Sequence, residues 1–405
     1  MAAVDDSKTQ KASVDDSERP ESLLDRASWF SNWVYTWPFE TLKLGLTKTL
    51  TPNDLPKLSH QDKSVSLTNH FEGKWRDELK QKAKPSFRRV LLKDYWDFSL
   101  FLQPLLITEE ACLIAQSILL GSLITSFSEF NDAQKNNLPT DAKKGFVIAG
   151  GMILCALGAL LAHHKYFFLT WRKGMQLKTG SIGLIFRKVL RLNFGVTSEA
   201  NGGGKVINLA TNDVERYMLA SIFLPYLFYS PLEAIVVLFI GMKYVGRSFA
   251  VGWVILMMAV PLQWWLSKRF AQVRSTVAQI TDKRVQLVGQ AVEGCRVMKM
   301  SGWENKFSRK IDEIRSLEVL QIQKSNRLRS ANEAIFFVVN VTIVLVTFTA
   351  HVEIFDEPIT PTIVFTCLTL INILQFRMTK FFSLGIMGAS EVLVSISRIQ
   401  AFLEY

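Results

Sequence analysis

Three long uncharged stretches constrain this chain more than any other feature of its sequence. Residues 249–266, 334–350 and 358–376 contain no Asp, Glu, Lys or Arg. A helix needs roughly 17 to 25 apolar residues to cross a bilayer, so each stretch is long enough for one crossing. Their apolar residues run on without the alternation that marks the half-buried elements of a soluble domain. The sequence therefore predicts a membrane protein.

Three further segments are nearly as apolar and complete the set of predicted spans. They are residues 98–127, 146–171 and 217–242. Acidic, basic and histidine side chains inside them are few, namely Glu109, Glu110, His163, His164, Lys165 and Glu233. We therefore expect an all-α membrane protein with six membrane-spanning helices, because helices satisfy every backbone group within the bilayer.

The distribution of lysine and arginine predicts how the spans are oriented. Connectors 172–216 and 267–333 carry 22 lysines and arginines, whereas the three loops on the opposite side carry 5. Cytosolic loops are enriched in these residues, so both termini are predicted to be cytosolic. The net charge of +11 is then explained by topology and by contact with anionic membrane lipid. We expect no nucleic-acid partner, because no compact basic motif stands apart from the membrane edges.

The two long connectors are predicted to continue the membrane helices into the cytosol. Neither contains proline, and apolar residues recur at helical spacing through 267–333. Two arms of about 30 residues would each extend about 45 Å from the membrane. Gly302 lies near the middle, so the turn would present Trp303 to a partner; alternatively, Trp303 packs onto its own turn. In the first connector the expected turn is the glycine run 201–204.

Several short motifs occur in an order that resembles a known family. The first connector contains Gly204-Lys205-Val206-Ile207-Asn208-Leu209 and then Thr211-Asn212-Asp213-Val214-Glu215-Arg216. The second contains Arg296-Val297-Met298-Lys299-Met300 and then Trp303-Glu304; Pro231-Leu232, Pro261-Leu262-Gln263 and Ser397-Arg398-Ile399 also fit. Over roughly residues 28–405 these motifs resemble the C subfamily of ABC transporters, the multidrug-resistance-associated group of short type. The resemblance implies the first transmembrane domain of a type 1 ABC exporter, with long cytosolic helical extensions.

The resemblance also implies a domain layout. It consists of a disordered tail 1–21, a lasso-like region 22–85, an interfacial elbow helix 86–98, the six-span domain 99–383 and a cytosolic end 384–405. In this family the two connector tips are coupling helices that dock into ATP-binding domains. By position these are residues 204–214 and 299–307. The predicted coupling residues are Lys205, Asn208, Asn212, Asp213, Lys299, Trp303 and Glu304.

The sequence contains no motif for hydrolysing ATP. It lacks a G-x-x-x-x-G-K-[ST] phosphate loop, since Glu199 stands at the first glycine position and Val206 follows Lys205. No ABC signature sequence is present either. We therefore expect no catalytic residues and no cofactor in this chain. ATP and Mg²⁺ would act through nucleotide-binding domains outside it, and a second transmembrane half is an expected partner.

Predicted substrate-cavity residues come from polar and aromatic positions within the spans. They are Glu110, His163, Phe167, Phe336, Gln375, Arg377, Lys380 and Phe381. A carboxylate in a membrane costs roughly 2.5 to 3.5 kcal/mol or more unless it faces a cavity or a partner. For Glu110 the alternative role is an ion pair between helices, for instance with Lys165. His163 has an interfacial or structural alternative, and the alternative for Phe336 is a position that faces lipid. No metal site is expected, because the adjacent histidines 163 and 164 have poor metal geometry.

Two basic residues near the end of the sixth span bear on the substrate. Arg377 and Lys380 are three residues apart, so on an α-helix they would share a face. Two cations facing a cavity favour organic anions. The family commonly has arginine where Gln375 stands, which weakens that preference, and snorkelling of both side chains toward the cytosol is the alternative.

The resulting prediction is a transmembrane domain of an ATP-driven exporter, in the plasma membrane, that moves organic anions or amphipathic compounds by alternating access. The alternatives are a non-pumping regulatory subunit, a truncated fragment, or an ATP-gated anion channel of the same architecture. A phosphate loop encoded beyond residue 405 would distinguish a fragment of a pump from a free-standing subunit.

Overall fold

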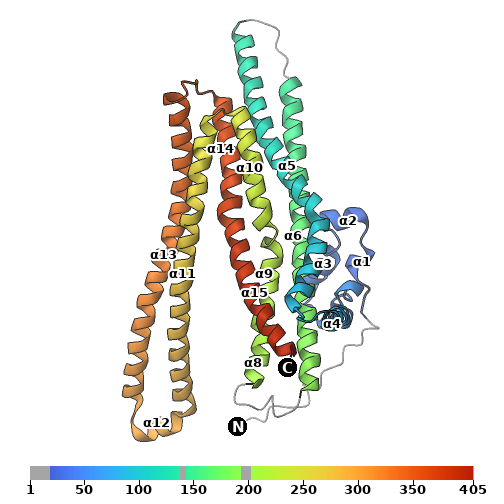
Figure 1. The fold of residues 1–405 in the computed structure, drawn as a ribbon, viewed down its shortest axis with the longest axis vertical. Coiled ribbons are helices and arrows are strands. Elements are labelled where there is room, and N and C mark those ends of the chain that lie inside the picture. The colour runs from blue at the N-terminus through green and yellow to red at the C-terminus, as the bar shows by residue number, and fades with distance from the viewer. Residues whose placement is uncertain (1–18, 137–142, 193–201, 405) are drawn as a thin grey trace. The chain divides into compact units, whose positions relative to one another are not determined.

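The computed structural model describes residues 19–136, 143–192 and 202–404. Within these ranges the chain is helical, and six helices are long and apolar enough to cross a membrane (Figure 1). They are α5 (Phe87–Lys135), α6 (Lys143–Arg191), the run Val206–Tyr244, α11 (Ser248–Glu293), α13 (Glu304–Glu353) and the run Pro361–Glu404. Each contains all or most of one predicted apolar stretch, so the all-α, six-span prediction is confirmed.

The shorter elements complete the chain. The N-terminal part holds α1 (Leu23–Arg26), α2 (Trp29–Val34), α3 (Phe39–Thr47), the single turns η2 (Pro52–Asp54) and η3 (His60–Asp62), and α4 (Ser64–Gln81). The run Val206–Tyr244 comprises the end of α8 (Gly202–Asn208), the π-helical η4 (Leu209–Asp213), α9 (Val214–Phe223) and α10 (Tyr226–Tyr244). The last run comprises α14 (Pro361–Gln375), the π-helical η5 (Phe376–Phe381) and α15 (Phe382–Glu404). The helix α12 (Cys295–Ser301) lies between α11 and α13.

The chain divides into two compact units. Unit 1 contains Met1–Cys112, Leu154–Pro225 and Gly385–Tyr405, and unit 2 contains Leu113–Ile153 and Tyr226–Leu384. Several helices therefore contribute to both units. Each unit has its own apolar core, so each is described by itself.

In unit 1 the N-terminal helices pack on α6. The buried residues Leu67, Phe71 and Trp75 recur every fourth position of α4 and form one apolar face. Phe71 lies so close to Gly180 of α6 that a Cβ there would come within 2.2 Å of its ring. Thr68 approaches Gly183 in the same way. Glycine on α6 is thus what lets α4 lie close against it.

Polar contacts reinforce this packing across long sequence separations. The Arg172 guanidinium donates from Nε to both carboxylate oxygens of Asp62, at 3.0 and 2.9 Å. Lys165 donates to Asn32 Oδ1 at 2.8 Å, and the Tyr35 hydroxyl donates to the carbonyl of His164 at 2.9 Å. These bonds join α6 to residues more than 100 positions earlier, so they fix where the N-terminal region lies within unit 1.

In unit 2, α11 and α13 run antiparallel side by side and α12 joins their ends (Figure 1). Gly302 closes α12 in the left-handed conformation, with φ of 62°. Farther along the pair, the buried carboxylate of Glu318 accepts bonds from Thr281 at 2.6 Å and Arg284 at 2.8 Å. The predicted helical hairpin with a turn at Gly302 therefore matches the structure, although its tip carries a short helix at 295–301 rather than at 299–307.

The first connector differs from the prediction at its glycine run. Gly202, Gly203 and Gly204 form the first turn of α8 rather than a turn between arms. Asn201 lies outside the described residues, as does most of the predicted tail 1–21. Glycine is a poor helix former by about 1 kcal/mol relative to alanine, which is why the sequence suggested a turn. The segment expected to be an elbow helix forms the first turns of α5, and its interfacial position stays a prediction.

Candidate functional site

Five of the eight predicted cavity residues come together around η5 in unit 2. They are Phe336, Gln375, Arg377, Lys380 and Phe381. The Gln375 side chain donates to the carbonyl of Phe336 at 2.6 Å, which ties the end of α14, just before η5, to α13. The residues that sequence analysis selected on two separate spans are therefore neighbours.

The π-helical backbone of η5 corrects one expectation about this cluster. On an α-helix Arg377 and Lys380 would share a face, but the wider i→i+5 turn of a π-helix does not return to the same face after three residues. Arg377 is buried, with 5% of its surface exposed, whereas Lys380 is exposed. The two cations therefore lie in different surroundings.

Each of these two cations is held by aromatic rings. The Arg377 guanidinium lies 5.4 Å from the centroid of Tyr226 and 5.0 Å from that of Phe381, and it donates to the Tyr226 hydroxyl at 3.2 Å. The Lys380 ammonium lies 4.9 Å from the ring of Phe336 and 5.4 Å from that of Phe376. Cation–π contacts orient a cation while leaving its positive charge in place. Lys380 can thus attract an anion without losing its aromatic support.

In unit 1 the other three predicted cavity residues lie on α5 and α6. The imidazole of His163 stacks on Phe167, with centroids 4.3 Å apart. Its Nδ1 lies 2.8 Å from a carboxylate oxygen of Glu109. Glu109 and Glu110 are both only 2% exposed. The sequence pattern favoured Glu110 and gave no sign of the contact of Glu109, because nothing local to either span shows which carboxylate faces His163.

A groove of about 490 Å³ adjoins these residues in unit 1. It is lined by Phe167, Trp171, Asn212, Glu215, Arg216, Met218, Leu219, Ile222, Phe223 and Glu391. Two ion pairs lie along it: Arg216 donates to Glu391 at 2.9 Å, and Lys178 of α6 pairs with Glu215. Of these residues, Phe167 and Asn212 were predicted as site residues from the sequence. The groove as a whole was not, because it forms only where α6, α9 and α15 pack together.

The predicted coupling residues lie on two separate segments. On the first, Asn212 donates to Asn208 Oδ1 at 2.6 Å, and the buried Asp213 accepts from Arg398 of α15 at 2.8 Å. Lys205 lies within α8, but its side chain is outside the described part of the structure. On the second segment, Lys299 and Glu304 form an ion pair at 3.1 Å across the turn.

Trp303 stands at the tip of the second segment. It precedes the first residue of α13 and is 46% exposed. A large aromatic ring that remains half exposed is available to contact another surface. That Trp303 couples this domain to ATP-binding domains stays a prediction, and its exposure is compatible with it.

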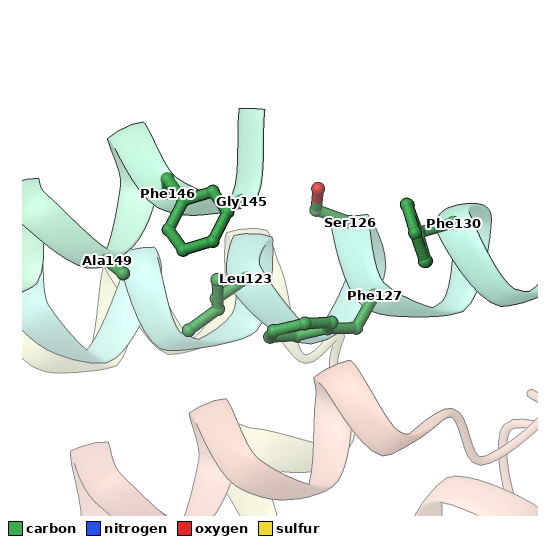
Figure 2. Close-up of a pocket in the computed structure, with 7 residues that line it drawn as sticks. All are labelled: Leu123, Ser126, Phe127, Phe130, Gly145, Phe146 and Ala149. Carbon is green, nitrogen blue, oxygen red and sulfur yellow. The ribbon is translucent and has the colours of Figure 1, made fainter. Parts of the chain in front are cut away.

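A second pocket, of about 220 Å³, has different chemistry. Figure 2 shows its lining residues on the ends of α5 and α6 that face each other. They are Leu123, Ser126, Phe127, Phe130, Gly145, Phe146 and Ala149. Ser126 supplies the only polar side chain among them, so this pocket offers no charge with which to select an ionic substrate.

The positions of the His, Cys, Asp and Glu side chains bear on whether the chain could bind a metal. Across residues 19–136, 143–192 and 202–404, no group of three or more His, Cys, Asp or Glu side chains could hold a metal ion. His163 contacts one carboxylate, that of Glu109, and the rings of Phe167 and His164.

The fold and its segments define a class first: a six-span helical membrane domain whose helices extend well beyond the apolar spans. Comparison with known proteins then gives the family. The family description "ABC transporter transmembrane region" matches residues 102–378. This chain belongs to the ABC transporter family as a transmembrane region of sub-family C, as the ordered motifs predicted.

Curated relatives cover nearly the whole chain. ATP-binding cassette sub-family C member 4 of Homo sapiens is 32% identical over 389 residues, which is 95% of this chain and 29% of that protein. Metal resistance protein YCF1 of Saccharomyces cerevisiae is 26% identical over 402 residues, which is 95% of this chain and 26% of that protein. Probable multidrug resistance-associated protein lethal(2)03659 of Drosophila melanogaster is 27% identical, with 95% and 27% covered. The chain thus spans less than a third of the length of these relatives.

Proposed function

We propose that this transmembrane domain moves organic anions or amphipathic compounds across the plasma membrane by alternating access. The observation that carries the proposal is the cluster around η5, where an exposed lysine and a buried arginine are each held by aromatic rings. Such a site offers positive charge for an anionic group and aromatic surface for an apolar body. Those are the two features that an amphipathic organic anion needs.

The energy for transport would come from ATP-binding domains that dock on the two coupling segments. The exposed Trp303 and the Asn208–Asp213 segment would contact those domains. Long helical arms such as α11 and α13 would transmit their closure, because packed helices move as rigid bodies. A second transmembrane half would complete the substrate path, and both termini would be cytosolic, as the lysine and arginine asymmetry favours.

The test is to replace the exposed cation without changing its shape much. In an assembly that contains the ATP-binding domains, we expect Lys380→Gln to reduce vesicle uptake of an aromatic sulfonate several-fold, because it removes the charge at the aromatic cluster. Lys380→Arg should retain most uptake, since a guanidinium also binds aromatic faces and anions. Uptake that is the same for wild type and both variants would refute a role of this cation in substrate recognition.

A further inference from the structure

One buried carboxylate holds three basic side chains where α4, α5 and α6 meet in unit 1. This carboxylate belongs to Asp94 of α5, which is 7% exposed. Its Oδ1 accepts from Lys74 of α4 and lies 2.8 Å from Nε2 of His70, and its Oδ2 accepts from Lys173 of α6 at 2.6 Å. Two charged lysines against one carboxylate leave the cluster with a net positive charge, and protonation of His70 would add to it.

Two of these basic side chains can be reached from outside the protein. The side chains of His70 and Lys74 are 48% and 41% exposed, whereas that of Lys173 is 13% exposed. His70 and Lys74 are four positions apart on α4, so they lie on one face of that helix. Because Asp94 already holds both side chains, an arriving anion has less side-chain freedom to remove. The exposed pair can therefore hold an anionic group with little rearrangement.

The exposed acids next along α4 and α5 do not neutralise the cluster by direct pairing. Asp77 follows Lys74 by three positions, Asp97 follows Asp94 by three, and both are exposed. Across the described part of unit 1, neither aspartate makes an ion pair with the three basic side chains. Charges that are exposed and make no close contact are weakened by water and salt. The excess of positive charge at the cluster therefore remains.

An apolar stripe runs from this cluster along α5. Phe98 and Phe101 lie four and seven positions after Asp94, so the three residues share one face of the helix. The Lys173 ammonium lies 5.3 Å from the centroid of the Phe98 ring, which places that ring beside the cluster. Phe101 is 79% exposed, and the predicted span begins at residue 98. The charged cluster thus lies where an apolar span begins, and exposed aromatic surface continues from it along the span.

We propose that this place binds one anionic phospholipid of the surrounding bilayer. His70 and Lys74 bind the phosphate of the headgroup, Lys173 adds positive charge behind them, and an acyl chain lies along Phe98 and Phe101. A lipid fits this place better than a free phosphate, because the apolar stripe begins directly at the charged cluster. The inference goes beyond the proposed function, since this lipid is bound by the protein and is not transported.

The position of the site gives the lipid a structural effect. Its phosphate contacts α4, and its acyl chain contacts α5, so one bound molecule joins the two helices. A ligand that binds the folded form and not the unfolded form raises the stability of the folded form. We therefore expect anionic phospholipid to raise the melting temperature of the chain.

The experiment measures lipid binding to the full chain in an uncharged detergent by native mass spectrometry. The probes are dioleoyl phosphatidylserine and dioleoyl phosphatidylcholine, which share their acyl chains and differ in headgroup charge. We expect the wild type to bind one phosphatidylserine about 3- to 10-fold more tightly than phosphatidylcholine. Lys74→Gln should remove most of this preference, and Lys74→Arg should retain it, because arginine also binds phosphate.

Lys80→Gln is the matched control for charge. Lys80 is exposed and lies six positions after Lys74, on another face of α4. The control removes the same charge from the same helix and should leave the preference for phosphatidylserine unchanged. It should also leave unchanged the rise in melting temperature that phosphatidylserine causes, whereas Lys74→Gln should reduce that rise.

Phe101→Ala tests the apolar part of the site. It should weaken the binding of both lipids several-fold, because it removes apolar contact and no charge. Inorganic phosphate has charge but no acyl chain, so it should displace little phosphatidylserine. Because Phe101 is exposed, this variant tests the proposal even if Lys74→Gln lowers the melting temperature without lipid.

Three results would overturn the proposal. Equal binding of the two lipids to the wild type shows that the cluster does not select a headgroup. An equal loss of preference in Lys74→Gln and Lys80→Gln shows that general surface charge is responsible. Displacement of phosphatidylserine by inorganic phosphate, with no effect of Phe101→Ala, identifies a site for free phosphate instead of lipid.

Discussion

Single residues in the N-terminal region illustrate how charge fixes a helix in place. Glu72 of α4 accepts from Arg187 and Arg191 of α6. The hydrogen bond from Arg187 is the largest influence on Glu72 and holds the pKa of its carboxyl below the usual value, against a smaller opposing effect of burial. A carboxyl whose folded pKa is depressed contributes stability above its unfolded pKa of about 4.3. That contribution is lost as the pH falls through the folded pKa.

We therefore expect the stabilising effect of Glu72 to depend on pH. Glu72→Gln should lower the melting temperature of the purified chain at pH 6 to 7, where the carboxylate is charged in both states. The difference from wild type should shrink as the pH falls below about 4.3, because Glu72 then becomes protonated in the wild type as well. Thermal unfolding in detergent from pH 7 to pH 3 measures this. Asp77→Asn, an exposed change on the same helix, is the control; if it behaves like Glu72→Gln, the effect is not specific to the α4–α6 contact.

For the two cations near the end of the sixth span, the spacing in the sequence gave a wrong prediction. Arg377 and Lys380 were expected on one helix face, but the π-helical η5 separates them. The π-helical backbone separates the two side chains, and nothing in the sequence indicates a π-helix here. The different burial of these two cations is why the transport prediction is made for Lys380, whose charge is exposed.

At the scale of elements, close approach of helices depends on a few glycines. On α6, Gly180 lets Phe71 of α4 lie where a Cβ would be. On α4 itself, Gly73 has open space around the position of a Cβ. The two glycines therefore have opposite physical roles, although both lie inside helices.

Replacing each of these glycines with alanine should change stability in opposite directions. Gly180→Ala should destabilise by about 1 to 3 kcal/mol, because α4 must move away from an overpacked contact. Gly73→Ala should stabilise by roughly 0.5 to 1 kcal/mol, because alanine loses less backbone entropy in a helix. Chemical unfolding followed by circular dichroism compares them. In a Phe71→Ala background the Gly180→Ala change should cost less than it does in the wild type, because the ring that its methyl group would meet is absent. A Gly180→Ala protein as stable as wild type would show that α4 does not pack as described.

At the scale of the whole molecule, the two coupling segments matter because they would link transport to an external source of energy. Trp303 is half exposed at the end of a pair of helices that pack along their length. We expect Trp303→Ala, in an assembly with ATP-binding domains, to retain ATP hydrolysis and to lose most substrate flux. The reason is that the arms remain folded while the contact at their tip is weakened.

The measurement compares the flux of substrate with the rate of ATP hydrolysis in the same vesicles. Trp303→Phe is the control, because it keeps an aromatic ring at the tip and should retain most flux. Expression and melting temperature should be unchanged in both variants, since the tip lies outside the cores of the two units. Unchanged flux in Trp303→Ala would contradict the coupling role.

The sequence by itself determined the features that depend only on residues close together along the chain. Three uncharged stretches and three nearly as apolar located all six spans, because a helix crosses a bilayer when it is long and apolar enough. Helical periodicity without proline predicted the arms of α11 and α13, and Gly302 marked their turn because it can adopt a positive φ. Ordered motifs were enough to predict the family that the comparisons show.

Tertiary structure alone decided which distant residues meet. The pairing of Arg172 with Asp62, the contact of Glu109 with His163 and the groove between α6, α9 and α15 all join segments far apart in the chain. Their positions depend on how whole helices pack, and on π turns that shift the register of a face. A local pattern reports which face of a helix is apolar, but it does not report which other helix covers that face. The polar contacts that define the candidate sites therefore emerged only with the packed structure.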